Sequence, residues 1–210
     1  PWFFAWGNWG REKLLRNGTL EQRIVVTGNP GWDWCFRPFK SSQEFVLFLG
    51  GDPPYDWARK IKFEKIWNDF PHILFAFKNH PVQDGRFYRE LRGMIQRDRV
   101  FSPNDESAMA LIRKASVVVT NTSTCGVEAM LAGKSTIIVE DGEKTDKFLP
   151  SGRVISPNYE SFVNELRLCL KHKENGEKIP SFLESVAYKN DGQSTQRVAD
   201  KIEEIGALNW

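Results

Sequence analysis

Short apolar runs and longer segments with a helical period alternate through the middle of this chain. The runs are rich in β-branched and aromatic residues, as in strands that are buried on both faces of a sheet. We predict strands at residues 45–49, 72–77, 100–101, 117–120, 136–139 and 154–155. We predict helices at residues 56–70, 87–95, 107–115 and 159–172, and a further helix that ends at Gly133. This alternation predicts an α/β fold, in which helices flank a parallel sheet.

The two ends of the chain are less regular. Near the start, we predict a buried segment at 1–7, a short helix at 11–16 and a strand at 23–27. The next residues contain Pro38 and show no period, so we expect a linker or crossover there. Near the end, we predict helices at 182–188 and 194–205, the second with one apolar face.

The segment 116–140 combines a buried strand, a hydroxyl-rich turn and a helix start. The turn consists of Asn121, Thr122, Ser123 and Thr124. Its oxygens and the free N–H groups of a first helical turn favour an anion, because the helix dipole is positive there. Glu128 follows one turn into the helix, within reach of a sugar hydroxyl. Capping of the helix without any ligand is the alternative interpretation of the same residues.

Two other predicted strands also end in residues suited to a phosphate. These ends are Gly50-Gly51 and Asn79-His80-Pro81. Ligands of open α/β sheets bind outside the carboxyl ends of the strands, so we expect these ends and the 121–124 turn at one site. Glycines permit close backbone approach and an imidazole donates a hydrogen bond. Lys78 is a further candidate, although a lysine at a strand end is commonly solvated and His80 alone would suit a structural role.

Composition narrows the classes of function. The net charge is +2, from 29 basic and 27 acidic residues, which gives no electrostatic reason to expect nucleic acid as a partner. Cys35, Cys125 and Cys169 lack metal-ligand spacing and are odd in number, so we expect a reducing compartment. No apolar run approaches the roughly 20 residues that span a bilayer. Because the chain starts at Pro1 without an initiator Met, we expect a piece of a longer protein.

The order of these motifs resembles the donor-binding half of the two-domain (GT-B) glycosyltransferases. It is most similar to bacterial enzymes that build capsule and surface polysaccharides from CMP-activated sugars of the Kdo or sialic acid type. The likeness extends over residues 6 to 206 and is carried by these segments: His80-Pro81, Thr122-Ser123-Thr124, Glu128-Ala129-Met130 with Gly133-Lys134, residues 26–30 with Asp33, and 191–194. Ser135-Thr136 replaces the Pro-Val that usually follows the lysine.

This resemblance implies a division of the chain and a role for each residue. Residues 1–42 would be the end of an acceptor-side domain plus a linker, 43–190 a Rossmann-like donor-binding domain, and 191–210 a helix that packs back toward the N-terminal part. His80 would be catalytic. The donor would be bound by Gly50, Gly51, Lys78, Pro81, Asn121, Thr122, Ser123, Thr124 and Glu128, without a metal or other cofactor.

The resemblance also implies partners and leaves alternatives open. We expect a nucleotide-sugar donor and a glycan or glycolipid acceptor, in the cytoplasm, with peripheral contact at the inner membrane face through a parent protein. A missing N-terminal domain or partner subunit would complete the active site. The alternatives are a nucleotide-sugar epimerase, a polyol-phosphate transferase, and a binding module without turnover.

Overall fold

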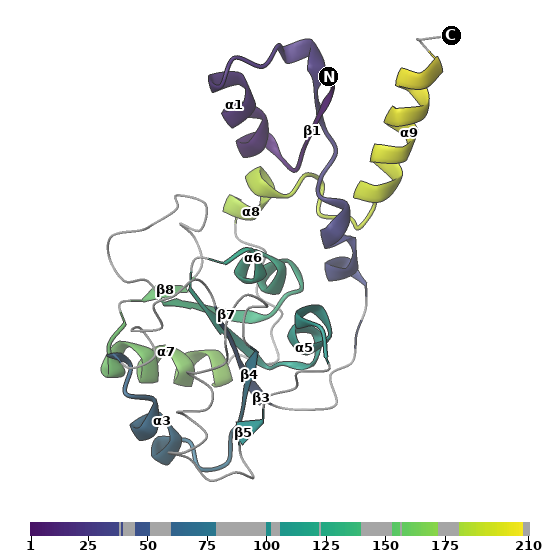
Figure 1. The fold of residues 1–210 in the computed structure, drawn as a ribbon. Coiled ribbons are helices and arrows are strands. Elements are labelled where there is room, and N and C mark those ends of the chain that lie inside the picture. Colours follow the sequence, from purple (N-terminus) through teal and green to yellow (C-terminus); the bar gives the residue numbers. More distant parts are fainter. Residues whose placement is uncertain are drawn as a thin grey trace. The chain divides into compact units, whose positions relative to one another are not determined.

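A computed structural model shows two compact units in the chain (Figure 1). The smaller unit joins residues 1–38 to 179–210, and the larger unit is the continuous segment 39–178. The structure describes residues 1–37, 39, 45–50, 60–78, 100–101, 106–121, 123–139, 153–155, 157–171 and 181–207. The predicted helix at 87–95 therefore lies outside the described residues.

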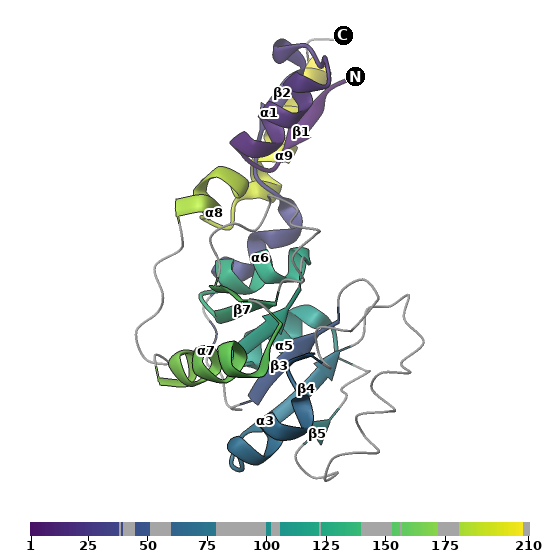
Figure 2. The same cartoon turned by 90° about the vertical axis from the view of Figure 1, so that its left-hand side faces the viewer.

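The larger unit is built on a sheet whose strands are all parallel. Its strands are β3 (Phe45–Leu49), β4 (Leu74–Lys78), β5 (Val100–Phe101), β6 (Val117–Thr120), β7 (Ser135–Val139) and β8 (Arg153–Ile155). Within the described residues their spatial order is β5-β4-β3-β6-β7-β8, and Figure 2 shows β3, β4 and β5 at one end of it. The chain therefore builds outward from β3 in one direction and then returns to build outward from β6 in the other. Each strand agrees with a predicted strand, so the predicted α/β architecture is confirmed.

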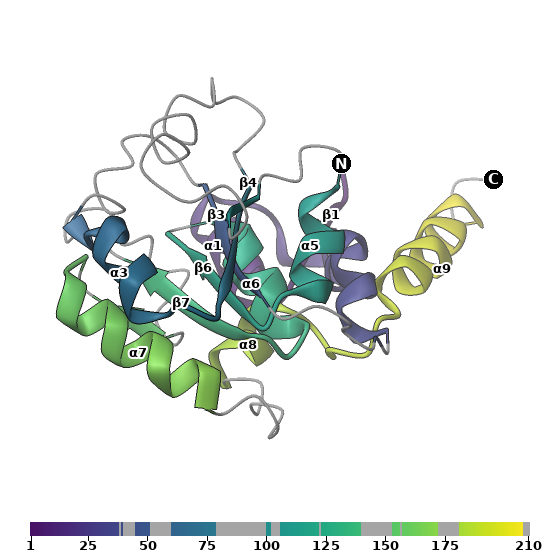
Figure 3. The same cartoon turned by 90° about the horizontal axis from the view of Figure 1, so that it is seen from below.

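Helices cover both faces of this sheet (Figure 3). On one face lie α3 (Phe63–Asp69) and α7 (Tyr159–Lys171), and on the other α5 (Ala108–Lys114) and α6 (Thr124–Leu131). Every residue of β3, β6 and β7 is buried, which is why these strands are apolar runs without alternation. The core beneath α3 and α7 is aromatic: the ring of Phe48 stacks on Phe77 at 4.8 Å and meets the edge of Phe63 at 5.2 Å.

Local signals explain where the helices of the larger unit begin and end. Ser107 caps α5 by accepting a hydrogen bond from the N–H of Ala110 at 3.2 Å. After α6, Gly133 adopts φ +69° and donates to the carbonyl of Met130, while Lys134 donates to that of Ala129. This pair of bonds is the Schellman arrangement that ends many helices.

One predicted helix is interrupted in the structure. We predicted a helix at 56–70; within its described residues, Lys60 is helical, residues 61–62 form a turn, and α3 begins at Phe63. Lys62 has a left-handed backbone (φ 53°) that a continuing α-helix cannot contain. The apolar pattern does not reveal this break because Ile61 is buried together with Ile66.

The smaller unit holds a short parallel pair of strands. Its elements are β1 (Phe3–Ala5), α1 (Asn8–Arg16), η1 (Glu21–Arg23), β2 (Ile24–Val26), η2 (Pro30–Phe36), α8 (Ser181–Val186) and α9 (Ser194–Ala207). α1 connects β1 to β2, and the pairing sets Phe3 beside Ile24 and Ala5 beside Val26. The linker predicted around Pro38 is in part the 3₁₀ helix η2, which starts at Pro30 where the side chain of Asn29 accepts from the N–H of Gly31.

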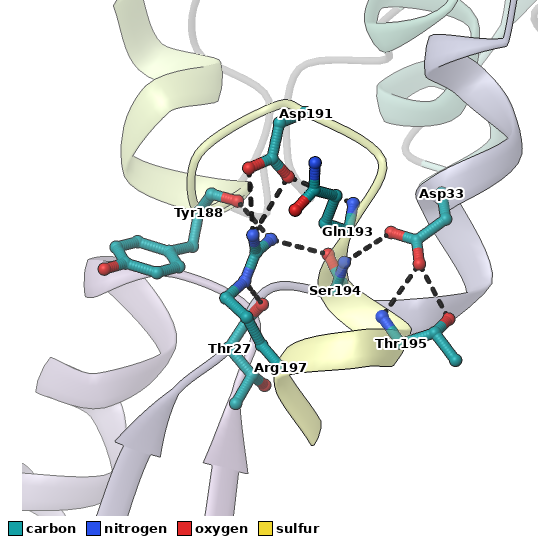
Figure 4. Close-up of polar contacts among 8 residues, drawn as sticks. All are labelled: Thr27, Asp33, Tyr188, Asp191, Gln193, Ser194, Thr195 and Arg197. Atoms are coloured by element: carbon teal, nitrogen blue, oxygen red, sulfur yellow. Dashed lines mark hydrogen bonds and ion pairs between the residues drawn. The ribbon is translucent and has the colours of Figure 1, made fainter. Parts of the chain in front are cut away.

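The start of α9 is joined to η2 through buried Asp33 (Figure 4). One carboxylate oxygen accepts from the N–H of Ser194 at 2.9 Å, and the other from the N–H and hydroxyl of Thr195 at 2.8 and 2.7 Å. Burial acts to raise the pKa of Asp33, but the hydrogen bonds from Thr195 and Ser194 outweigh it and the pKa is lowered.

A second group of contacts fixes the turn before α9 (Figure 4). Arg197 donates to the carbonyl of Thr27 at 2.7 Å and to both oxygens of Asp191 at 2.9 and 3.0 Å. Gly28 is confined there, because a Cβ at its φ of +87° would lie 2.3 Å from the hydroxyl of Ser194. Segments 27–33 and 191–197 therefore form one interlocked structure within the smaller unit.

The units divide the chain at other positions than the predicted domains. We placed boundaries at 42/43 and 190/191, whereas the compact units meet at 38/39 and 178/179. The difference matters most for α8, which lies with the smaller unit: the N–H of Tyr188, just after α8, donates to the carbonyl of Trp6. The assignment of the units to acceptor and donor sides stays a prediction.

Candidate functional site

The strand order of the larger unit locates the candidate site between β3 and β6. These neighbouring strands are followed by crossovers that leave in opposite directions, so the loops after them separate at the sheet edge. In open α/β sheets this reversal of strand order creates the crevice where ligands bind. The register pairs Leu49 of β3 with Lys78 of β4. On the other side of β3, Phe48 pairs with Val119 of β6, so Leu49 lies beside Thr120, one position further on. Gly50 and Asn121 therefore leave the sheet side by side.

Two hydrogen bonds hold the end of β3 in place. The N–H of Gly50 donates to the carbonyl of Lys78 at 2.9 Å, and the Thr120 hydroxyl donates to the carbonyl of Leu49 at 3.4 Å. Lys78 is half-buried and follows Phe77, which faces the α3–α7 core, so Lys78 belongs to the other face, together with α5 and α6. Lys78 and Thr120 thus lie on the face of the sheet from which α6 begins.

The turn after β6 leads directly into α6. The N–H of Ser123 donates to the carbonyl of Asn121 at 2.7 Å. Ser123 is the N-cap: its hydroxyl accepts from the N–H of Cys125 at 3.3 Å, and its carbonyl accepts from that of Gly126 at 2.9 Å. Capping is therefore observed for Ser123, while its hydroxyl proton is still available to a ligand oxygen.

Thr124 stands out among the described residues of the turn for its unpaired donors. It is the first residue of α6 and is exposed. Among the described residues, neither its N–H nor its hydroxyl has a hydrogen-bond partner, as expected of a first-turn N–H that has no acceptor within the helix. Two donors at the positive end of a helix dipole match the needs of a phosphate oxygen.

Glu128 and Cys125 occupy successive turns of α6. Both are half-buried, one turn apart. Burial, and secondarily the negative charge of Glu128, raise the pKa of the Cys125 thiol. Cys125 is accordingly a protonated thiol at neutral pH and not a nucleophile.

Sequence reasoning missed Gly126. A Cβ at this position would lie 3.1 Å from side-chain carbons of Ile138 and Thr120, which is tighter than ordinary contact. Glycine therefore lets the first turn of α6 lie close against β6 and β7. A glycine in the first turn of a predicted helix that follows a buried strand was the available signal.

Lys134, part of the resemblance to the glycosyltransferases, has a structural contact. Its ammonium donates to the carbonyl of Arg113 at 2.7 Å, near the end of α5. Burial, and then the charge of Arg113, lower the pKa of Lys134. This contact lies before β6 and β7 begin, at the sheet edge opposite to Asn121 and Thr124.

Several predicted site residues lie outside the described residues: Gly51, His80, Pro81 and Thr122. The structure brings together the others, Gly50, Lys78, Asn121, Ser123 and Thr124, at the carboxyl edge, with Glu128 one turn into α6. Among the described residues, no three side chains of the His, Cys, Asp and Glu types gather as a metal site would require. Nor does this part of the chain contain a helix long and apolar enough to span a membrane.

Solved structures share this fold. No protein-family model and no curated protein matches the chain. A candidate UDP-N-acetylglucosamine 2-epimerase from Listeria monocytogenes is 18% identical with a TM-score of 0.69, covering 98% of this chain and 59% of its own. The UDP-GlcNAc 2-epimerase from Neisseria meningitidis, bound to UDP-GlcNAc, is 13% identical with a TM-score of 0.68, covering 97% and 60%. The wall teichoic acid polymerase TagF, soaked with CDPG, is 15% identical with a TM-score of 0.66, covering 97% and 55%.

These similarities concern the fold. The chain spans somewhat under two thirds of the length of each neighbour, at identities below one fifth. The neighbours are proteins of the GT-B fold, and the chain has the parallel, helix-flanked sheet that they share.

Proposed function

We propose that the larger unit binds a nucleotide-activated sugar between the ends of β3 and β6. The observation that carries this proposal is the reversal of strand order, with Gly50 and the start of α6 on its two sides. A phosphate would accept hydrogen bonds from the N–H and hydroxyl of Thr124 and from the hydroxyl of Ser123. Glu128, one turn further on, would accept from a ribose hydroxyl. The neighbours that carry UDP-GlcNAc or CDPG in their names support a ligand of this class.

The activity we propose is sugar transfer from a CMP-linked donor to a glycan or glycolipid acceptor. In such a transfer, negative charge grows on the leaving phosphate, and preorganised donors stabilise it without a metal. His80 would supply one donor and the first turn of α6 the others. Loss of one such donor raises the barrier by about 2.7–4 kcal/mol, so His80→Ala in the parent protein should lower the rate roughly a hundred- to a thousandfold.

Epimerisation of a nucleotide sugar is the second candidate. It is supported by the names of two neighbours, both UDP-GlcNAc 2-epimerases, one of them a candidate. Incubating the parent protein with a nucleotide sugar and no acceptor separates the two reactions. An epimerase would change the sugar configuration under these conditions, whereas a transferase would return the sugar unchanged or hydrolyse it slowly.

We further propose that an N-terminal domain or partner subunit completes the smaller unit. Parallel strands are stable in sheets covered on both faces, yet β1 and β2 are a pair of three-residue strands. Phe3, Trp6 and Leu20 beside them are 37%, 42% and 63% exposed. In the parent protein, amide exchange in β1 and β2 should be much slower than in this chain, and equal rates would refute the proposal.

Calorimetric titration with CMP, CDP, UDP, GDP and UDP-GlcNAc tests the binding proposal. At least one nucleotide should bind, and Thr124→Val should weaken it by roughly five- to tenfold through loss of a hydrogen bond of about 1–1.5 kcal/mol. Failure of every nucleotide to bind would leave the turn with its capping role alone.

Ser107→Ala is the matched control for Ser123→Ala. Both substitutions remove an N-cap hydroxyl, so each should lower the stability of the larger unit by about 0.5–2 kcal/mol. Only Ser123→Ala should also weaken nucleotide binding. If the two variants bind nucleotides equally well, Ser123 serves only as the N-cap of α6.

A further inference from the structure

The side chain of Asn121 has a buried polar atom that nothing satisfies. Asn121 follows the last residue of β6, and its backbone carbonyl accepts from Ser123. Its side-chain oxygen Oδ1 is buried and has no hydrogen-bond partner within the described part of the chain. Buried polar side chains nearly always have a partner, so such an atom calls for a physical explanation.

The hydroxyls on either side of Asn121 make other bonds in the structure. The Thr120 hydroxyl donates its proton to the carbonyl of Leu49, so it is not available to Oδ1. The Ser123 hydroxyl accepts from the N–H of Cys125 and makes no bond to Oδ1 of Asn121. Asn121 is also the residue that leaves the sheet beside Gly50, at the reversal of strand order. Among the described residues, the other buried polar atoms without partners are on Arg113, near the end of α5, and on Asn190 of the smaller unit.

We propose that Asn121 is a specificity-determining residue that hydrogen-bonds a neutral hydroxyl or ring amide of the bound nucleotide sugar. This inference rests on the proposed function, which assigns the phosphate to Thr124. An uncharged amide suits a neutral group beside that phosphate, whereas a carboxylate there would repel it. The terminal torsion of asparagine is broad, so the amide turns toward a ligand at little expense and escapes its unsatisfied state.

The free protein should be more stable without this amide. Asn121→Leu replaces it with an apolar group and removes the unsatisfied atom, so the melting temperature should rise. Its affinity for UDP or CMP should fall at least about fivefold, because the ligand group loses its partner. Affinity for inorganic pyrophosphate should stay unchanged, because Asn121 contacts the neutral part of the ligand.

Asn68→Leu is the matched control. Asn68 is an exposed residue of α3, and its side chain donates to the carbonyl of Glu64 at 3.4 Å. The same substitution there should change neither nucleotide nor pyrophosphate affinity. Asn121→Asp keeps the size of the side chain and adds charge, and it should weaken all three ligands.

Three other results are possible, and each contradicts a different claim. If the wild-type protein binds nucleotides and Asn121→Leu binds them equally well, this inference fails while the proposed function stands. If Asn121→Leu weakens pyrophosphate as much as UDP, or lowers the melting temperature, Asn121 shapes the turn and does not select the ligand. If the wild-type protein binds no nucleotide, both statements fall together.

Discussion

Replacing Asp33 by alanine should detach the start of α9 from η2. The substitution removes a buried carboxylate that accepts three hydrogen bonds from Ser194 and Thr195, at 2.7 to 2.9 Å. These residues are 161 and 162 positions away in the sequence, so no local structure replaces the contact. We expect α9 to lose its ordered first turn while the larger unit stays folded.

The magnitude follows from the geometry. A hydrogen bond to a charged group contributes about 1.5–3 kcal/mol, and loss of a helix N-cap removes about 0.5–2 kcal/mol. The three bonds share one carboxylate and are not additive, and Thr195 is exposed enough for water to replace part of the loss. We therefore expect Asp33→Ala to destabilise the smaller unit by about 2–3 kcal/mol, and Asp33→Asn by about half as much.

The pH dependence gives a second measure of the same contact. The pKa of Asp33 is lowered in the folded protein, so its contribution is fully present above the ordinary carboxyl pKa. The contribution disappears as the pH falls through the lowered value. The stability of the smaller unit should therefore decline with acid in the wild-type protein more steeply than in Asp33→Ala.

Hydrogen exchange of α9 amides, followed by mass spectrometry, measures the effect. Exchange should accelerate by roughly 30- to 150-fold in Asp33→Ala, the equivalent of 2–3 kcal/mol. Asp200→Ala is the control, because this exposed aspartate of α9 bonds only to Gln196 within its own helix among the described contacts. Wild-type exchange rates in Asp33→Ala would refute the role given to the carboxylate.

Three further predictions concern the larger unit. The pKa of Lys134 is lowered by burial and by Arg113. The stability of the wild-type protein should therefore rise as the pH increases from that lowered pKa toward the ordinary lysine value. Urea titrations at several pH values should show this rise in the wild-type protein and not in Lys134→Met. Gly126→Ala should destabilise the larger unit by about 1–2 kcal/mol, because the added methyl group overpacks the contact with β6 and β7 by more than alanine gains in helix propensity. An unchanged midpoint of urea unfolding would contradict the close packing. Cys125 should react slowly with iodoacetamide at pH 7, and Glu128→Gln should speed the reaction by lowering the thiol pKa; alkylation as fast as that of free cysteine would contradict the raised value.

Much of the fold could be read from local patterns. The apolar runs at β3, β6 and β7 predicted strands buried on both faces, because only such strands lack an alternating polar face. Ser123 and Gly133 marked the two ends of α6, because capping by a hydroxyl and by a left-handed glycine depends on backbone groups within a few residues. The left-handed Lys62 was missed, because a lysine gives no local signal for that conformation.

The sequence by itself thus determined which residues form strands and helices, and which polar side chains end a strand. The tertiary structure decided which strands are neighbours, since pairing depends on how faces far apart in sequence are buried together. Only the order β4-β3-β6 brings Gly50 beside Asn121. Only the tertiary structure shows that the Thr120 hydroxyl is bonded to the carbonyl of Leu49, whereas Thr124 has no hydrogen-bond partner among the described residues. The bonds between Asp33 and the start of α9 could not be predicted either, because no sequence pattern indicates a hydrogen bond between residues 161 positions apart.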